Sequence, residues 1–259
     1  MLRLMNWKSA ISYYRDLRPN NLFTKKYRHL LLLLYWPVHF GIFVVLENFA
    51  PIWYKAITGA ELHYTEIVCA LDAYIPFCEA FVIPYYAWFV FLAGMVFYGL
   101  LFDIRAYREY MWFVILTYFS TLIIYIIFPN MQGLRPTPEA LGRDNFFVDV
   151  VRWLYSYDTN TNVCPSIHVL GTLAASVPLL RGKRFRSWIW KTFWIVSTVL
   201  ICLSTVFLKQ HSVLDVIFAV VLFFACYPLV YCVLCKRRAG EDEQDAAELA
   251  PVTQSPENS

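Results

Sequence analysis

The sequence predicts an all-α polytopic membrane protein, a bundle of six transmembrane helices in one domain. Hydrophobic residues make up 59% of the 259 residues and charged residues only 16%, whereas a soluble domain has about 25% charged residues. Long apolar runs recur along the chain, and most approach the ~20 residues that a spanning helix needs. The net charge of +3 gives no support to a nucleic-acid partner, so the expected partners are the lipid bilayer and a membrane lipid.

Six apolar stretches define the expected helices. They cover residues 30–50, 78–102, 110–128, 166–181, 188–207 and 211–234. The fourth stretch is short and opens at Pro165, a residue type favoured at the first helical position. Pro37, Pro84 and Pro178 fall within helices, which bundles tolerate when neighbouring helices satisfy the freed carbonyl groups. The helices together form an expected catalytic domain over residues 29–235.

The two flanking segments have different compositions. In residues 1–28, four apolar side chains fall on one helical face with basic residues between them, which favours an interfacial amphipathic helix over a frayed basic tail; they are Leu4, Trp7, Ile11 and Tyr14. Residues 236–259 become acidic and contain Pro and Ser from Ala239 onward. That composition predicts a disordered tail.

Lys and Arg residues predict the orientation of the bundle. With a cytoplasmic N-terminus, 17 of the 22 basic residues fall on the cytoplasmic side. The other five are Lys55, Arg135, Arg143, Arg152 and Lys209. Because cytoplasmic loops carry the excess of basic residues, both termini are expected in the cytoplasm. The plasma membrane is the expected location.

Three short polar clusters fall on the same, outer side of this topology. They are Gly133–Pro136, Pro165–His168 and Lys209–Asp215, and each lies at or near the end of an apolar stretch. Two of them open helices, so they become neighbours if those helices pack together. Together they supply two histidines, an arginine, a lysine, a serine and an aspartate, which are the groups needed to move a phosphoryl group through a phosphohistidine.

His211 and Asp215 are four residues apart and therefore share one helix face. A carboxylate one turn deeper in the membrane is costly unless it is paired. Paired with an imidazole N–H, it fixes the tautomer and leaves the other ring nitrogen free to act as a nucleophile. A purely structural buried pair is the competing interpretation, but it does not explain the other two clusters.

The remaining polar residues suit phosphate binding and acid catalysis. Ser166 and His168 lie in the first turn of a helix, where free backbone N–H groups favour an anion, and His168 is placed to protonate a leaving oxygen. An N-terminal capping turn is the alternative for these two. Arg135 has a planar fork that grips phosphate oxygens in pairs. Lys209 either neutralises another oxygen or extends to the membrane interface.

These clusters resemble the type 2 phosphatidic acid phosphatase superfamily, whose signature is KxxxxxxRP, then PSGH, then SRxxxxxHxxxD. The resemblance covers roughly residues 78–234. Arg135 and Pro136 match the end of the first motif, Pro165–His168 matches the second with Ile167 in place of Gly, and the third is matched by Ser204, His211 and Asp215. The resemblance implies an integral membrane lipid phosphatase that needs no metal or other cofactor, with His211 as nucleophile, His168 as general acid and Ser204 near the phosphate.

Two basic residues of the signature are missing. Phe128 stands where the first motif has Lys, and Thr205 stands where the third has Arg. Sparse motifs of this kind are more similar to the branch that contains inositol-phosphorylceramide and sphingomyelin synthases. The phosphoryl acceptor therefore stays open between water, which we favour, and a lipid alcohol. A non-catalytic lipid-binding or transport protein is a third alternative, although no internal repeat supports a transporter.

Other polar residues are weaker candidates. Glu79, Asp158 and Asn162 lie at the outer side and are expected either to approach the site or to be structural. His39 is alone in mid-helix and is expected to pack, and His63 is expected at a loop surface. No residues show the spacing of a metal site. Cys69, Cys78 and Cys164 could all lie outside the cytoplasm, so a disulfide among them is an open expectation.

Overall fold

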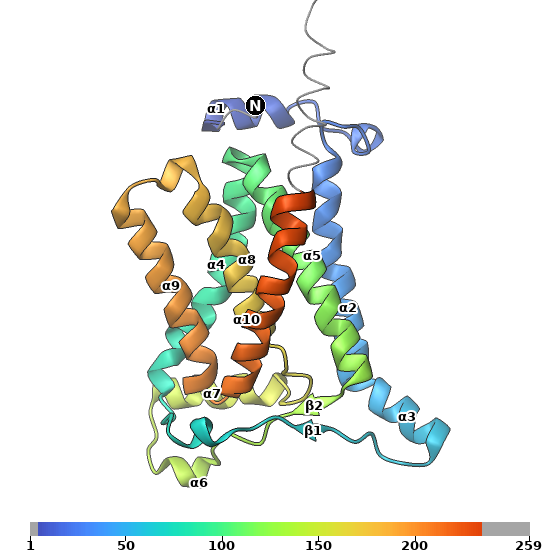
Figure 1. Cartoon of the computed structure of the whole chain (residues 1–259), viewed down its shortest axis with the longest axis vertical. Coiled ribbons are helices and arrows are strands. Elements are labelled where there is room, and N and C mark those ends of the chain that lie inside the picture. Colours follow the sequence, from blue (N-terminus) through green and yellow to red (C-terminus); the bar gives the residue numbers. More distant parts are fainter. Residues whose placement is uncertain (1–4, 235–259) are drawn as a thin grey trace, which may run out of the picture.

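The chain folds into a bundle of long helices with short elements gathered at its two ends (Figure 1). The computed structural model describes residues 5–234. The helices are α1 Trp7–Tyr14, α2 Tyr35–Asn48, α3 Ala50–Thr58, α4 Val82–Phe102, α5 Ile104–Ile127, α6 Pro138–Leu141, α7 Phe146–Tyr157, α8 Ile167–Arg181, α9 Trp188–Phe207 and α10 Val213–Pro228, and the strands are β1 Thr65–Glu66 and β2 Asn130–Met131. The tail expected from residue 236, like Leu4, lies outside the described residues.

Five helical segments of the described chain are long and apolar enough to cross a membrane. They are Arg28–Asn48, Glu79–Phe102, Ile104–Ile127, Trp188–Phe207 and Val213–Leu234, and they support an integral membrane protein. The expected fourth helix, α8, has only 15 residues and is about 22 Å long, short of the ~30 Å hydrocarbon core. The expected count of six spans is therefore not confirmed.

Helix α8 nevertheless lies at the centre of the bundle, where it packs against α4, α5, α9 and α10. Its buried residues are mostly small, which allows this close packing. Gly171 is required there, because an added Cβ would lie 2.3 Å from the hydroxyl oxygen of Tyr118. That hydroxyl donates to the carbonyl of Ile167 at 2.9 Å, so the tyrosine fixes the start of α8.

The turn between α4 and α5 is tighter than the apolar pattern predicts. The expected helix began at residue 110, but α5 begins at Ile104, directly after Asp103. Asp103 caps the new helix by accepting from the backbone N–H of Ala106 at 3.0 Å. The apolar pattern misses this first turn because it contains charged residues, two of which, Arg105 and Glu109, form an ion pair at 3.0 Å.

The two ends of the bundle differ in structure (Figure 1). Helix α1 lies across one end. At the opposite end lie α3, α6, α7 and the parallel β1–β2 pair, in which Thr65 is opposite Asn130. Helix α7 lies in the stretch between the expected third and fourth helices, where the apolar pattern predicts no helix. This second end is where the polar clusters come together.

Candidate active site

The His211–Asp215 pair forms at the start of α10, but not on one helix face as expected, because the helix begins at Val213 and His211 precedes its N-cap, Ser212. His211 Nδ1 lies 3.2 Å from Asp215 Oδ2, and the same oxygen accepts from the backbone N–H of Ser212 at 2.9 Å. Ser212 and Asp215 thereby form a capping box at the helix N-terminus. Asp215 is fully buried and His211 is 6% exposed. A carboxylate on Nδ1 leaves Nε2 as the nitrogen available for chemistry.

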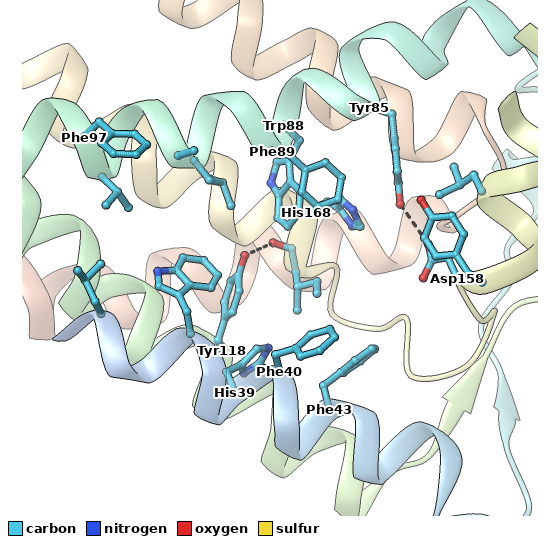
Figure 2. A pocket seen from close by; sticks show the side chains of 18 residues that line it. His39, Phe40, Phe43, Tyr85, Trp88, Phe89, Phe97, Tyr118, Asp158 and His168 are labelled. Carbon is cyan, nitrogen blue, oxygen red and sulfur yellow. Dashed lines mark hydrogen bonds between the residues drawn. The ribbon is translucent and has the colours of Figure 1, made fainter. Parts of the chain in front are cut away.

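His168 faces this pair from the start of α8. Its ring centroid is 5.6 Å from that of His211, in an edge-on arrangement. Tyr85 and Trp88 of α4 hold the His168 ring at centroid distances of 4.7 and 4.3 Å, as Figure 2 shows. The backbone N–H of Ser166 donates to the carbonyl of Asp215 at 3.2 Å. The structure thus brings together the second and third clusters.

Arg135 reaches the same region, but three acceptors already hold its guanidinium. It donates to the carbonyls of Asp158 and Thr159, each at 2.7 Å, and to the side-chain oxygen of Gln210. The guanidinium also lies 4.6 Å from the ring centroid of Tyr155. Burial lowers the pKa of Arg135. Gln210 is its only side-chain acceptor among the described residues, so it is the partner that a phosphate oxygen could most readily replace.

Gln210 joins Arg135 to Asp158. Its amide donates to Asp158 Oδ2 at 3.1 Å, and the same oxygen accepts from the Tyr85 hydroxyl at 3.2 Å. Burial raises the pKa of Asp158, and the positive charge of Arg135 acts in the opposite direction. Asp158, a weak candidate from the sequence, is therefore part of the site. Gln210 was overlooked, although it lies inside the third cluster.

Lys209 does not point toward the two histidines. Its backbone is in the left-handed region, with φ of 53°, and its ammonium group donates to the carbonyls of Asp72 and Ile75 at 2.7 and 2.5 Å. Burial lowers the pKa of Lys209, whereas the charge of Asp72 raises it. The expected phosphate ligand instead anchors the segment between α3 and α4.

Asp72 is a second anchor of that segment and was not predicted. Its carboxylate accepts from the Ser212 hydroxyl at 2.6 Å, from the Val213 N–H at 2.8 Å and from the Cys69 N–H at 2.8 Å. Burial would raise the pKa of Asp72, but these hydrogen bonds outweigh it and the pKa is lowered. The start of α10, which carries His211, is therefore fastened to residues 69–75 by a buried anion.

The loop before α8 is held by two other residues that the sequence did not reveal. Asn130 accepts from the N–H groups of Val163 and Cys164 at 2.9 and 2.8 Å and donates to the Cys164 carbonyl at 3.0 Å. Glu47, at the end of α2, accepts from Thr159 and, at 2.5 and 2.6 Å, from Thr161 and Asn162. Asn162, a weak candidate, thus has a structural position.

Three further candidates have local partners. Ser166 is the N-cap of α8, where its hydroxyl accepts from the Val169 N–H at 3.4 Å. Ser204 is fully buried and donates to the Ile201 carbonyl at 2.6 Å within α9. Glu79 is ion-paired with Arg143. None of these contacts directs a side chain toward the histidine pair.

No disulfide joins Cys69, Cys78 and Cys164, all of which are free thiols. Burial raises the pKa of Cys164, and the nearby Asp215 carboxylate adds to the effect. Metal ligands were not expected, and within residues 5–234 no group of three or more His, Cys, Asp or Glu side chains is arranged to hold a metal ion.

An apolar cavity of about 510 Å³ opens beside His168. Figure 2 shows α4 residues from Tyr85 to Phe97 on one side and α2 residues, including Phe40 and Phe43, on the other. His168 and Asp158 lie at one end. We call this space the α2–α4 groove.

The geometry is compatible with a nucleophilic histidine, its orienting carboxylate and a second histidine that acts on the leaving group. Comparison of the chain with protein-family models, with curated proteins and with solved structures finds no match.

Proposed function

We propose that the protein is an integral membrane lipid phosphatase that acts through a phosphohistidine on His211. The observation that carries the proposal is the face-to-edge pair of His168 and His211, with Asp215 on Nδ1 of the latter. In this proposal α8 is a sixth membrane-embedded helix, both termini are cytoplasmic, and the site faces the outer leaflet of the plasma membrane. Membership of the type 2 phosphatidic acid phosphatase superfamily rests on the three motifs alone.

The reaction has two steps. His211 Nε2 attacks phosphorus, the bond from phosphorus to the lipid oxygen breaks, and His168 gives that oxygen a proton. His168 then takes a proton from water, the water oxygen attacks phosphorus, and the phosphorus–nitrogen bond breaks to release phosphate. Asp215 stabilises the positive charge that develops on His211. Arg135 binds a phosphate oxygen in exchange for Gln210, where preorganised donors contribute most.

The first test uses purified protein in vesicles that contain phosphatidic acid. His211→Ala is expected to abolish both phosphate release and an acid-labile phosphoprotein, because His211 is the proposed nucleophile and its Nδ1 contacts the Asp215 carboxylate. His63→Ala is the matched control, since His63 is exposed and lies outside the site. Near-normal turnover in His211→Ala would contradict the mechanism. Activity is expected to survive EDTA, and complete loss restored by one divalent ion would contradict the metal-free chemistry.

Topology has its own test. Cysteine at position 143 should react with a membrane-impermeant reagent added outside cells, and cysteine at position 184 should not, in a background that lacks other accessible cysteines. Arg143 pairs with Glu79, just before α4 begins, whereas Arg184 lies over the ring of Phe102, at the other end of α4, which also contacts Trp7 of α1. The reverse pattern would place the site on the cytoplasmic side.

Lipid phosphotransfer to an alcohol is the second candidate, because Phe128 and Thr205 replace two basic residues of the signature, as in the lipid-synthase branch. Within the described residues, Arg135 is the single cationic side chain that contacts Gln210. Thr205, in place of the expected Arg, donates its hydroxyl to the Cys202 carbonyl at 2.8 Å. Vesicles with a labelled phospholipid donor and ceramide or diacylglycerol acceptors distinguish the two. Free phosphate or phospho-alcohol supports hydrolysis, whereas label that appears mainly on a second lipid supports transfer.

A further inference from the structure

The α2–α4 groove has a one-sided apolar lining that follows the helix repeat. On α4 the lining residues are Tyr85, Trp88, Phe89, Leu92, Ala93, Val96 and Phe97. These positions are spaced by three and four residues and form one continuous stripe. From Tyr85 to Phe97 the stripe is about 18 Å long, close to the ~15 Å depth of one hydrocarbon leaflet.

The opposite wall comes from the start of the first long helix. Leu33, Trp36, Phe40 and Phe43 line it, and they span about 15 Å. Tyr118 and Ile167 of the inner helices also line the cavity, and the hydrogen bond between them ties these helices together. The groove is therefore bounded by three sides of protein and is apolar along nearly its whole length.

Only one end of the groove carries ionisable groups that belong to the site. His168 and Asp158 both line the cavity there, and His168 is the residue that would protonate the leaving oxygen. The alcohol that leaves would therefore emerge into an apolar channel. A volume of about 510 Å³ lies within the range of sites that hold one small molecule, which suits a single hydrocarbon chain.

We propose that the α2–α4 groove binds one acyl chain of the phosphate ester, with the ester at His168 and the chain end near Phe97. This inference rests on the proposed function. Ala93 then determines chain length. It lies eight residues from Tyr85, about 12 Å along the helix, and its small side chain leaves the middle of the groove open. A lipid tail gains no hydrophobic energy on leaving the bilayer, so the selection depends on fit.

The experiment uses non-hydrolysable alkyl phosphonates with a photoreactive group at the chain end, in vesicles with the intact protein. The hexadecyl probe is expected to label Leu33, Val96 or Phe97, and the octyl probe to label Phe89 or Leu92. Ala93→Trp should reduce hexadecyl labelling about tenfold, equal to ~1.4 kcal/mol, and leave octyl labelling unchanged. Val90→Trp is the matched control, because Val90 is 73% exposed and does not line the groove.

Phe97→Ala provides a second variant in case tryptophan at position 93 prevents folding. It removes bulk at the end of the groove farthest from Tyr85 and should move the label beyond Val96. Labelling elsewhere on the protein, or equal loss in Ala93→Trp and Val90→Trp, would overturn the inference. The readout is independent of catalysis. Groove labelling without turnover would support the acyl-chain site and refute the phosphatase. Turnover without groove labelling would refute the acyl-chain site and support the phosphatase.

Discussion

Replacing Asp72 by asparagine tests whether a buried anion holds the start of α10. The carboxylate satisfies three donors: the Ser212 hydroxyl and the N–H groups of Val213 and Cys69. Asparagine keeps one acceptor oxygen. If that oxygen faces Val213, the amide nitrogen faces Ser212, whose hydroxyl can turn to accept, and Cys69, whose N–H cannot.

The expected cost of Asp72→Asn follows from these contacts. One buried N–H left without an acceptor costs about 1–3 kcal/mol, and loss of a negative charge at a helix N-terminus costs ~0.3–1 kcal/mol. The free energy of unfolding should therefore fall by about 2–3 kcal/mol. At roughly 2–4 °C per kcal/mol for a chain of this size, the thermal midpoint in detergent should fall by about 5–10 °C. Asp144→Asn removes an exposed ion pair with Arg152 and should cost less than ~1 kcal/mol.

The contribution of Asp72 to the free energy of unfolding depends on pH, and the direction follows from the pKa of its carboxyl group. The pKa of Asp72 is lowered in the folded state by its hydrogen bonds, against the opposing effect of burial. Its stabilisation is therefore complete above the unfolded pKa of about 3.9 and disappears as the pH falls through the lower, folded pKa. The difference between wild type and Asp72→Asn should stay constant from pH 7 to about 5. Equal midpoints at pH 7, or a difference that shrinks before pH 5, would refute the reasoning.

Three other predictions concern the site and its supports. Glu47→Gln should lower turnover more than Glu61→Gln, because Glu47 accepts three hydrogen bonds from the loop before α8; equal rates for the two variants would contradict this. Gly99→Ala should reduce folded yield and thermal midpoint, since its Cβ would lie 2.8 Å from a backbone carbon of α5; a wild-type midpoint would be the contrary result. Asp215→Asn should reduce the initial rate by ~10³–10⁴-fold, as in a Ser-His-Asp triad whose aspartate is replaced, because the amide no longer fixes the His211 tautomer; a loss below about tenfold would remove Asp215 from the mechanism.

Hydropathy and helical spacing were sufficient to predict most of the elements that contribute residues to the candidate site. The four-residue interval placed Asp215 under His211, and the expected topology brought His168 to the same end of the bundle. The four-residue interval is a local signal. The topology depends on the length of the apolar stretches, which the thickness of the bilayer determines. The start of α5 was missed because its first turn contains Arg105 and Glu109, whose polarity hides a helix that begins at a capping aspartate.

Partners in the loops around the candidate site could not be predicted from the sequence for a different reason. Lys209 turns away from the histidines because its backbone adopts a left-handed conformation, which a side-chain pattern does not reveal. Asp72 belongs to a segment with no helical or strand periodicity, so nothing marks the residue as a ligand for Ser212. Arg135 was predicted at the site, but its partners were not. They are two backbone carbonyls and Gln210, and because every residue type has a backbone carbonyl, the sequence does not mark which ones accept.

Glu47 connects the end of α2 to the loop before His168, so a movement of this helix in the bilayer is transmitted to that loop. His39 is the one residue of α2 that is buried, so most of this helix surface faces lipid. A helix in that position adjusts its tilt when the hydrocarbon thickness changes. Its end is bound to Thr161 and Asn162, and a change in tilt therefore pulls on the residues that precede His168. The alignment of His168 and His211 therefore depends on the thickness of the membrane.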